Sequence, residues 1–353
     1  MSLASRPYFD VGTRYLVGAA CLVVIVAGLR AAAQLVLPFL VAVCLAVVSV
    51  PFMRWLQHRR VPRALAVFCT ILSAGAVVGL LGLIVGRAVN EFTIEVPRYQ
   101  YRLQGLIESV MVLADDIGLP TEEWSAFNLF PVGIFDLLGG TLGAIASFTS
   151  NTFLVLLTVV FILVEATGFS SKLRLALGKE THFGQLEQMI RQVQNYLVIK
   201  TLISAGTGIV VGLCLAVIGL DFALLLGLIV FVLNFIPTLG SIIAAVPAVL
   251  LALVQFDFAT ASLVALVYVG VNLVCGTVIE PILMGRRLGL STLVIFVSLV
   301  FWGWVWGPIG MLFSVPLTMV VKIALENTKD LRWVAVMLDA DPSATPAQTR
   351  AES

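Results

Sequence analysis

Charged residues are scarce in this sequence of 353 residues. Only 12% of them are Asp, Glu, Lys or Arg, whereas about 25% is usual in a soluble domain, and 60% are hydrophobic. This composition excludes an ordinary soluble protein. The formal net charge is +1, and the chain has no basic surface pattern interleaved with aromatic residues, so no nucleic-acid partner is expected.

Residues that usually build metal and enzyme centres are also few. The only two histidines, His58 and His182, fall in polar segments, and no HExxH or GxSxG motif occurs. The five cysteines form no CxxC pair and all lie in apolar stretches, which is typical of small packed side chains. The sequence therefore predicts no enzyme, no metal site and no cofactor.

Long stretches without any charge dominate the chain and cover more than half of it. A helix needs about 20 apolar residues to cross a hydrocarbon core of roughly 30 Å, and most of these stretches are long enough. Their continuous apolar character does not fit the short alternating strands of a β-barrel. We therefore predict an all-α polytopic membrane protein. The uncharged windows are 15–29, 31–53, 64–86, 137–164, 201–220, 222–256, 258–279 and 288–321.

The positive charges predict the orientation in the membrane, because Lys and Arg are retained on the cytoplasmic side. A basic loop with Arg54, Arg59, Arg60 and Arg63 follows the second window, whereas residues 88–136 carry eight acids against two arginines. Both termini are thus expected inside, in the cytoplasmic membrane of a bacterium. About six full transmembrane helices are expected.

The pattern divides the chain into four parts. Residues 1–87 are predicted to hold the first three transmembrane helices, and 88–140 a small extracytoplasmic helical insert. Residues 141–322 would form the transport core, which includes a cytoplasmic amphipathic helix at about 170–200, either on the membrane surface or packed on a neighbour. Residues 323–353 are expected to be a cytoplasmic helix and a disordered tail.

Two of the windows, 222–256 and 288–321, are too long for one span and too short for two. Each has Pro and Gly in its middle, at 234–241 and 306–310, where a helix can break. Acids flank the first window and basic residues flank the second, so each window is predicted to begin and end on the same side of the membrane. We interpret them as two opposed re-entrant helical hairpins. Long kinked helices, or tight hairpins without a transport role, are the alternatives.

Glycines at small-residue spacing occur in the third and fifth spans. Such residues allow membrane helices to approach closely, so we predict helix packing rather than chemistry there. They are Gly75, Gly79 and Gly82 in one span and Gly206, Gly208 and Gly212 in the other.

Three motifs give the sequence a resemblance to the autoinducer-2 exporter-like (AI-2E) transporter family. They are Asn234-Phe235-Ile236-Pro237-x-x-Gly240, Val278-Ile279-Glu280-Pro281-x-x-x-Gly285 and Trp304-x-Trp306-Gly307-x-x-Gly310. The resemblance covers roughly residues 10–335. It implies a secondary transporter that exports an autoinducer-2-like solute or exchanges a monovalent cation for protons, and it implies a homo-oligomer in the lipid bilayer.

Glu280 is the most informative single residue, because a carboxylate inside a membrane is costly and usually functional. Desolvation favours its neutral, protonated form, which would suit proton exchange. The alternative is an interfacial acid paired with Arg286 or Arg287. Amides, hydroxyls and freed carbonyls near the helix breaks complete the candidate substrate or ion site. Its predicted members are Glu280, Asn234, Pro237, Thr238, Gly240, Ser241, Asn272, Pro281, Gly307 and Gly310.

A passive oligomeric channel or a membrane scaffold would share these sequence features. Flux against a gradient, driven by a coupled ion, distinguishes a carrier from either of them.

Overall fold

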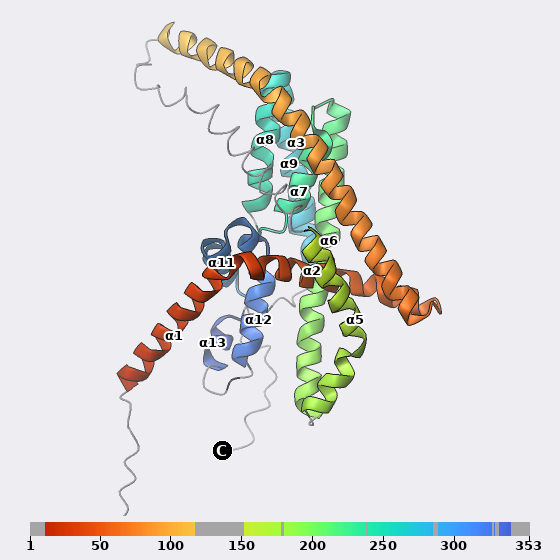
Figure 1. Ribbon diagram of the computed structural model, residues 1–353. Helices are drawn as coiled ribbons and strands as arrows, with labels where there is room; N and C mark the ends of the chain where they lie inside the picture. Colours follow the sequence, from red (N-terminus) through yellow and green to blue (C-terminus); the bar gives the residue numbers. More distant parts are fainter. Residues whose placement is uncertain are drawn as a thin grey trace, which may run out of the picture.

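The computed structural model describes residues 11–116, 152–177, 180–237, 239–284, 289–326, 328 and 332–339. Every regular element in these ranges is a helix (Figure 1). In chain order they are α1 (Val11–Ala31), α2 (Ala33–His58), α3 (Arg63–Asp116), α5 (Thr152–Leu177), α6 (Glu180–Ile218), α7 (Ala223–Leu233), α8 (Leu239–Gln255), α9 (Phe258–Asn272), the π-helical segment η2 (Leu273–Ile279), α10 (Glu280–Met284), α11 (Thr292–Leu312), α12 (Ser314–Glu326) and α13 (Arg332–Met337).

Five of the described helices are long and apolar enough to cross a membrane, so the prediction of an all-α polytopic membrane protein is confirmed. The apolar parts of α1 and α5 are shorter. The five segments are Ala33–His58, Arg63–Glu95, Ile190–Ile218, Phe258–Leu283 and Thr292–Leu312.

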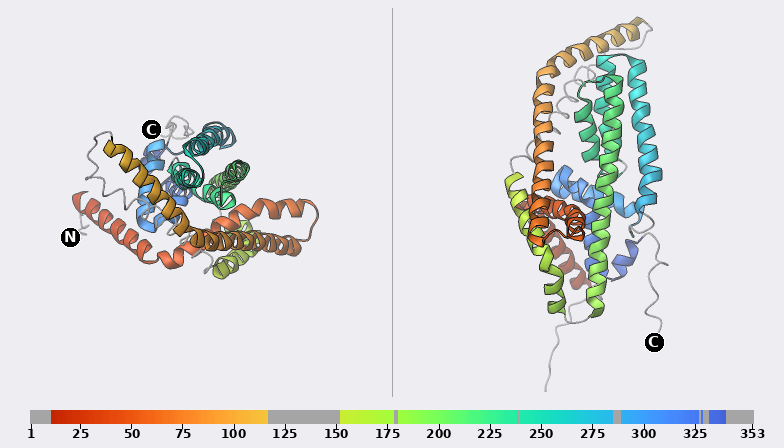
Figure 2. Two further views of the ribbon diagram at one scale, coloured as in Figure 1. Left: turned by 90° about the horizontal axis from the view of Figure 1, so that it is seen from above. Right: turned by 90° about the vertical axis from the view of Figure 1, so that its right-hand side faces the viewer.

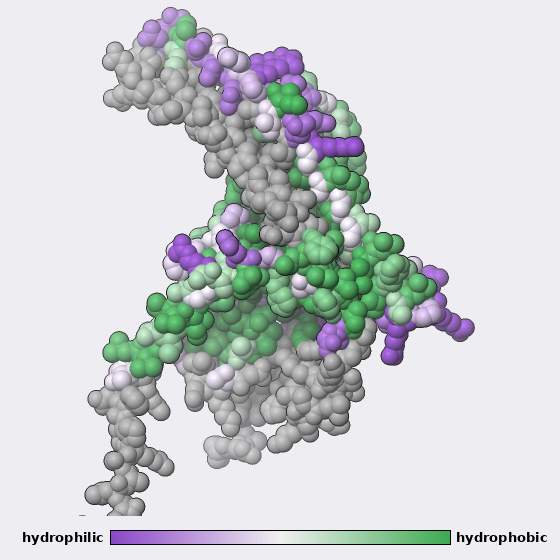
Figure 3. Space-filling model, in the orientation of Figure 1, coloured by the Kyte–Doolittle hydropathy of each residue, from purple (hydrophilic) through white to green (hydrophobic). Residues whose placement is uncertain are grey.

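α3 is one continuous helix that passes the expected boundary at residue 88 between the third span and the insert. It starts at the basic turn after α2 and ends among the acids Asp115 and Asp116. Hydrophobic residues cover α2 and the adjoining part of α3, whereas hydrophilic residues gather at the far end of α3 (Figure 3). The rest of the predicted insert, residues 117–140, lies outside the described part.

The window 222–256 folds back on itself, as the break at its centre predicted. α7 and α8 are joined by a turn that begins with Asn234, Phe235, Ile236 and Pro237, and a Cβ on Gly240 would lie only 1.8 Å from the Leu233 carbonyl oxygen. At the open end, the Asp221 amide donates to Gln255 Oε1 at 2.9 Å, and Gln255 Nε2 donates to the Gly219 carbonyl at 3.2 Å. The two ends of this hairpin are therefore held side by side.

The window 288–321 also reverses, at Gly307 within α11. Gly307 has φ 66° and ψ −149°, a conformation open almost only to glycine. Beyond it, a Cβ on Gly310 would lie 1.9 Å from the Trp302 carbonyl oxygen. The ends are again clasped, because Lys322 Nζ donates to the Gly289 carbonyl at 2.5 Å. Both windows thus form hairpins; their entry into the membrane from opposite faces stays a prediction.

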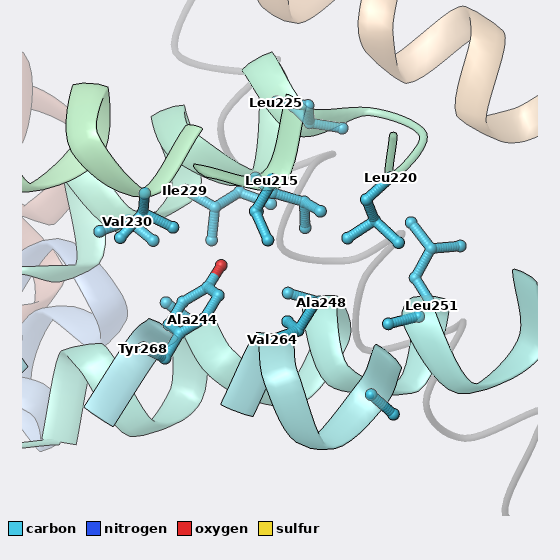
Figure 4. Close-up of a cluster of buried hydrophobic side chains, with 14 of the residues drawn as sticks. Leu215, Leu220, Leu225, Ile229, Val230, Ala244, Ala248, Leu251, Val264 and Tyr268 are labelled. Atoms are coloured by element: carbon cyan, nitrogen blue, oxygen red, sulfur yellow. The ribbon is translucent and has the colours of Figure 1, made fainter. Parts of the chain in front are cut away.

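α6 is the central helix that connects two apolar cores (Figure 2). Its later turns pack with α7 and α9, around Leu215 and the facing Val264 (Figure 4), and residues of α3 and α8 belong to the same core. Its earlier turns pack through Tyr196 and Leu197 with α2 and α12. Each hairpin therefore contributes to a different core, and α6 belongs to both.

Candidate functional site

A lysine of α6 forms an ion pair with Glu280. Lys200 Nζ lies 2.7 Å from Glu280 Oε1, and the exposed fractions of the two side chains are 3% and 26%. Lys200 is ten residues into the apolar segment Ile190–Ile218, or about 15 Å along the helix axis. The structure thus places both a cation and an anion within helices that are long and apolar enough to cross a membrane.

This contact bears on two expectations. Lys200 ends the segment 165–200 that is predicted to be cytoplasmic, but α6 continues without a break past it, and the Lys200 side chain is buried. The alternative partners of Glu280, Arg286 and Arg287, lie outside the described residues. The described partner of Glu280 is Lys200, 80 positions away in the sequence.

The next turn of α6 reaches the tip of the first hairpin. Asn234 Nδ2 donates to the Ser204 hydroxyl at 3.0 Å, and Ser204 is completely buried. Since Lys200 and Ser204 are four residues apart, they lie on the same face of α6. Two of the predicted site residues, Glu280 and Asn234, are therefore brought to successive turns of one helix.

Thr207 extends this polar face of α6, although its hydroxyl donates to the carbonyl of Ile203 in its own helix at 2.8 Å. We call Lys200, Ser204 and Thr207 the polar stripe of α6. Sequence reasoning missed the stripe. Its spacing of four and three residues was a readable signal, but the charge of Lys200 suggested an end of the span instead.

The backbone before Glu280 is wider than an α-helix. In η2, hydrogen bonds reach five residues back, so the Glu280 amide donates to the Cys275 carbonyl. Pro281, which is exposed, has no amide hydrogen to continue the pattern. π-Helical turns are rare and often occur at functional sites.

The other predicted site residues have different surroundings. Gly240 and Gly310 permit close backbone approach within their hairpins, and Gly307 makes the second reversal, so these three glycines have structural roles. Asn272 is exposed on α9, whereas Pro237 and Ser241 are half-buried near the first tip. Thr238 lies outside the described residues.

The second tip packs elsewhere. Trp306 Nε1 donates to the Leu29 carbonyl of α1 at 3.0 Å, and Trp302 Nε1 donates to the Thr318 hydroxyl of α12 at 3.1 Å. The first contact anchors the second tip to α1 and the second joins the two arms of this hairpin, whereas Asn234 anchors the first tip to α6.

A separate cavity of about 560 Å³ lies at the open end of the first hairpin, between α3 and the turn before α7. Its lining includes Arg87, Glu91 and Asp221. The Tyr99 hydroxyl donates to Asp221 Oδ2 at 2.6 Å. Removal from water and this hydrogen bond raise the pKa of Tyr99 above its usual range, so it remains a donor throughout the physiological pH range.

Comparison with known proteins gives matches over nearly the whole chain. Residues 19–330 match the family described as AI-2E family transporter. The AI-2 transport protein TqsA of Escherichia coli (strain K12) is 38% identical over 329 residues, which cover 93% of this chain and 96% of the relative. A putative transport protein of Haemophilus influenzae is 35% identical over 333 residues, covering 92% and 96%. The family match includes every predicted site residue.

Proposed function

Because the chain belongs to the AI-2E transporter family and is therefore a membrane transporter, we propose that it is a secondary transporter of the bacterial cytoplasmic membrane. Its proposed substrate is a small polar solute of the autoinducer-2 type, the kind of molecule named for the Escherichia coli relative. The other proposed transport mode is the exchange of a monovalent cation for protons. We further propose that the chain works as a homo-oligomer with both termini inside.

The observation that carries this proposal is the Lys200–Glu280 ion pair beside the Asn234–Ser204 hydrogen bond. Together these groups offer a carboxylate acceptor, an ammonium donor, an amide and a hydroxyl. A proton bound to Glu280 would remove the negative charge and occupy a carboxylate oxygen that could otherwise accept a hydrogen bond from the solute. Proton binding and solute binding then exclude one another at Glu280, which is the basis of coupled exchange.

The hairpins supply the proposed movement. Asn234 at the tip of α7–α8 and Glu280 at the end of η2 both contact α6, so these elements would move together as one half of the molecule. Alternating exposure would follow from motion of the hairpin-bearing half against α1, α2 and α3.

Glu280→Gln tests the proposal in proteoliposomes that contain purified full-length protein. The amide keeps the shape of the side chain but cannot release a proton, so proton-coupled flux of AI-2 should fall at least tenfold. The substitution also leaves the buried ammonium of Lys200 without its anion, and breaking such pairs costs about 3–5 kcal/mol in soluble proteins. The variant Lys200→Met/Glu280→Gln removes both charges and should recover stability without recovering flux.

The matched control is Glu108→Gln, which makes the same chemical change at an exposed position of α3 and should leave flux unchanged. Wild-type flux and pH dependence in Glu280→Gln would assign Glu280 a structural role. Movement of AI-2 only down its own concentration gradient would favour the passive channel. Absence of any flux in proteoliposomes that contain folded protein would favour the scaffold.

A further inference from the structure

Lys200 occupies the position beside Glu280 that a transported cation would need. Its ammonium lies 2.7 Å from Glu280 Oε1, at hydrogen-bond distance. The Lys200 side chain is only 3% exposed, so it has no free route into water while the surrounding helices keep this packing. The carboxylate is therefore already neutralised by a cation that is covalently part of the protein.

We infer that Lys200 is the built-in counter-cation of the site, so that free monovalent cations such as Na⁺ or Li⁺ are excluded from Glu280 and the chain does not exchange them for protons. This inference rests on the proposed function, because it concerns the same site and selects between its two transport modes. The remaining substrate class is a polar solute without a net positive charge.

Charge balance supports the assignment. One carboxylate and one ammonium sum to zero, and a second cation would add an uncompensated charge in a medium of low dielectric constant. The neighbouring polar side chains are neutral: the Asn234 amide and the Ser204 hydroxyl contact each other one turn further along α6. They add no negative charge that could hold another cation.

The other titratable groups described around the pair do not change this balance. Tyr196 is one turn before Lys200 on α6 and is close enough to Glu280 for an electrostatic interaction. Cys44 of α2 packs in the same cluster as Tyr196, and Cys275 lies on η2. Phenols and thiols are ordinarily neutral at neutral pH, so these groups supply no anion for a cation.

The arrangement is complementary to a neutral, hydroxylated solute. The three hydrogens of the ammonium are donors and the two carboxylate oxygens are acceptors, so a solute hydroxyl can donate to Glu280 and accept from Lys200 at the same time. A bare cation could interact with only one member of the pair and would be repelled by the other. Lys200 is thus a residue that determines specificity.

Removal of the ammonium tests the inference. Purified full-length wild type and Lys200→Met are heated in NaCl, LiCl or choline chloride at one ionic strength. The variant leaves Glu280 without a cation, so Na⁺ or Li⁺ should raise its unfolding temperature by several degrees relative to choline, whereas the wild type should show no such difference. Lys200→Met/Glu280→Gln, which lacks the carboxylate, should lose the effect.

Arg102→Met is the control, since it removes a positive charge from an exposed position of α3 and should respond like the wild type. Lys200→Gln serves the same purpose as Lys200→Met if the latter does not fold. Equal stabilisation of the wild type and the Lys200 variant by Na⁺ or Li⁺ would overturn the inference, as would no stabilisation of the variant.

A pH-sensitive dye inside proteoliposomes provides the second readout. A pulse of Na⁺ or Li⁺ should produce no proton flux through the wild type above that of protein-free liposomes. Wild-type protein that moves AI-2 and also exchanges Na⁺ for protons would contradict the inference but leave the proposed function intact. Protein that moves neither would contradict the proposed function, while the thermal comparison still decides the role of Lys200.

Discussion

At the scale of single residues, glycines decide how closely α6 and α7 approach. A Cβ on Gly227 would lie 2.7 Å from the Gly208 carbonyl oxygen and 3.1 Å from the Gly212 Cα, and both neighbours are backbone atoms that cannot rotate away. This contact holds the first hairpin against the polar stripe of α6. Small residues are the usual means of such close approach between membrane helices.

We therefore expect Gly227→Ala to destabilise the protein by about 1–3 kcal/mol, the usual effect of overpacking. Thermal unfolding of the purified protein in detergent measures this. Gly79→Ala is the control, because a Cβ there would meet nothing within 4 Å among the described residues and alanine is the better helix former. Equal stability of the two variants would show that the α6–α7 contact is looser than described.

At the scale of elements, each hairpin depends on one backbone reversal. The second reversal rests on Gly307, whose positive φ is strained for any residue with a Cβ. The first uses a turn from Asn234, whose side chain also contacts α6. A change at the second tip should therefore affect folding, whereas a change at the first affects the candidate site as well.

Gly307→Ala should cost about 1–3 kcal/mol because alanine must adopt an unfavourable backbone conformation. Gly303→Ala in the same helix is a matched comparison: its three nearest neighbours would all be atoms of the Met311 side chain, including Cε at 2.7 Å and Cγ at 2.8 Å, and that side chain can change rotamer. The unfolding temperatures of the two variants measure this difference in stability. A Gly307→Ala protein as stable as Gly303→Ala would mean that the reversal does not depend on glycine.

At the scale of the whole molecule, α3 connects the first hairpin with the predicted topology. α3 runs from the basic turn near Arg59 to the acids near Asp115. Tyr99, in the C-terminal half of α3, contacts Asp221 at the open end of the first hairpin. The open end of that hairpin, including Asp257, is therefore predicted to share a side with Asp115 and to lie opposite Arg59.

Cysteine labelling of intact cells checks this topology in a background without the five native cysteines. Asp115→Cys and Asp257→Cys should react with an impermeant reagent added outside, whereas Arg59→Cys should react only after the membrane is permeabilised. Positive charge near Arg59 retains that turn in the cytoplasm. The opposite labelling of Asp257 and Asp115 would separate the first hairpin from the outer side.

The sequence predicted those parts of the fold that depend on local physics. Bilayer thickness sets the length of an apolar helix, so uncharged windows predicted the helical membrane class directly. Proline and glycine act on their own backbone, so they marked both reversals. The AI-2E resemblance likewise came from residues close together in the chain, and the family match confirms it.

Only the tertiary structure decided which distant residues meet. Lys200 and Glu280 are 80 positions apart, and no local pattern connects them; their contact exists because α6 continues past the expected end of its span. The glycines show the same limit: Gly208 contacts the backbone of α7, whereas Gly79 has open space around it among the described residues. Spacing alone predicted both to pack. Composition and backbone preference belong to the chain, but charge pairing and close packing depend on where helices cross in space.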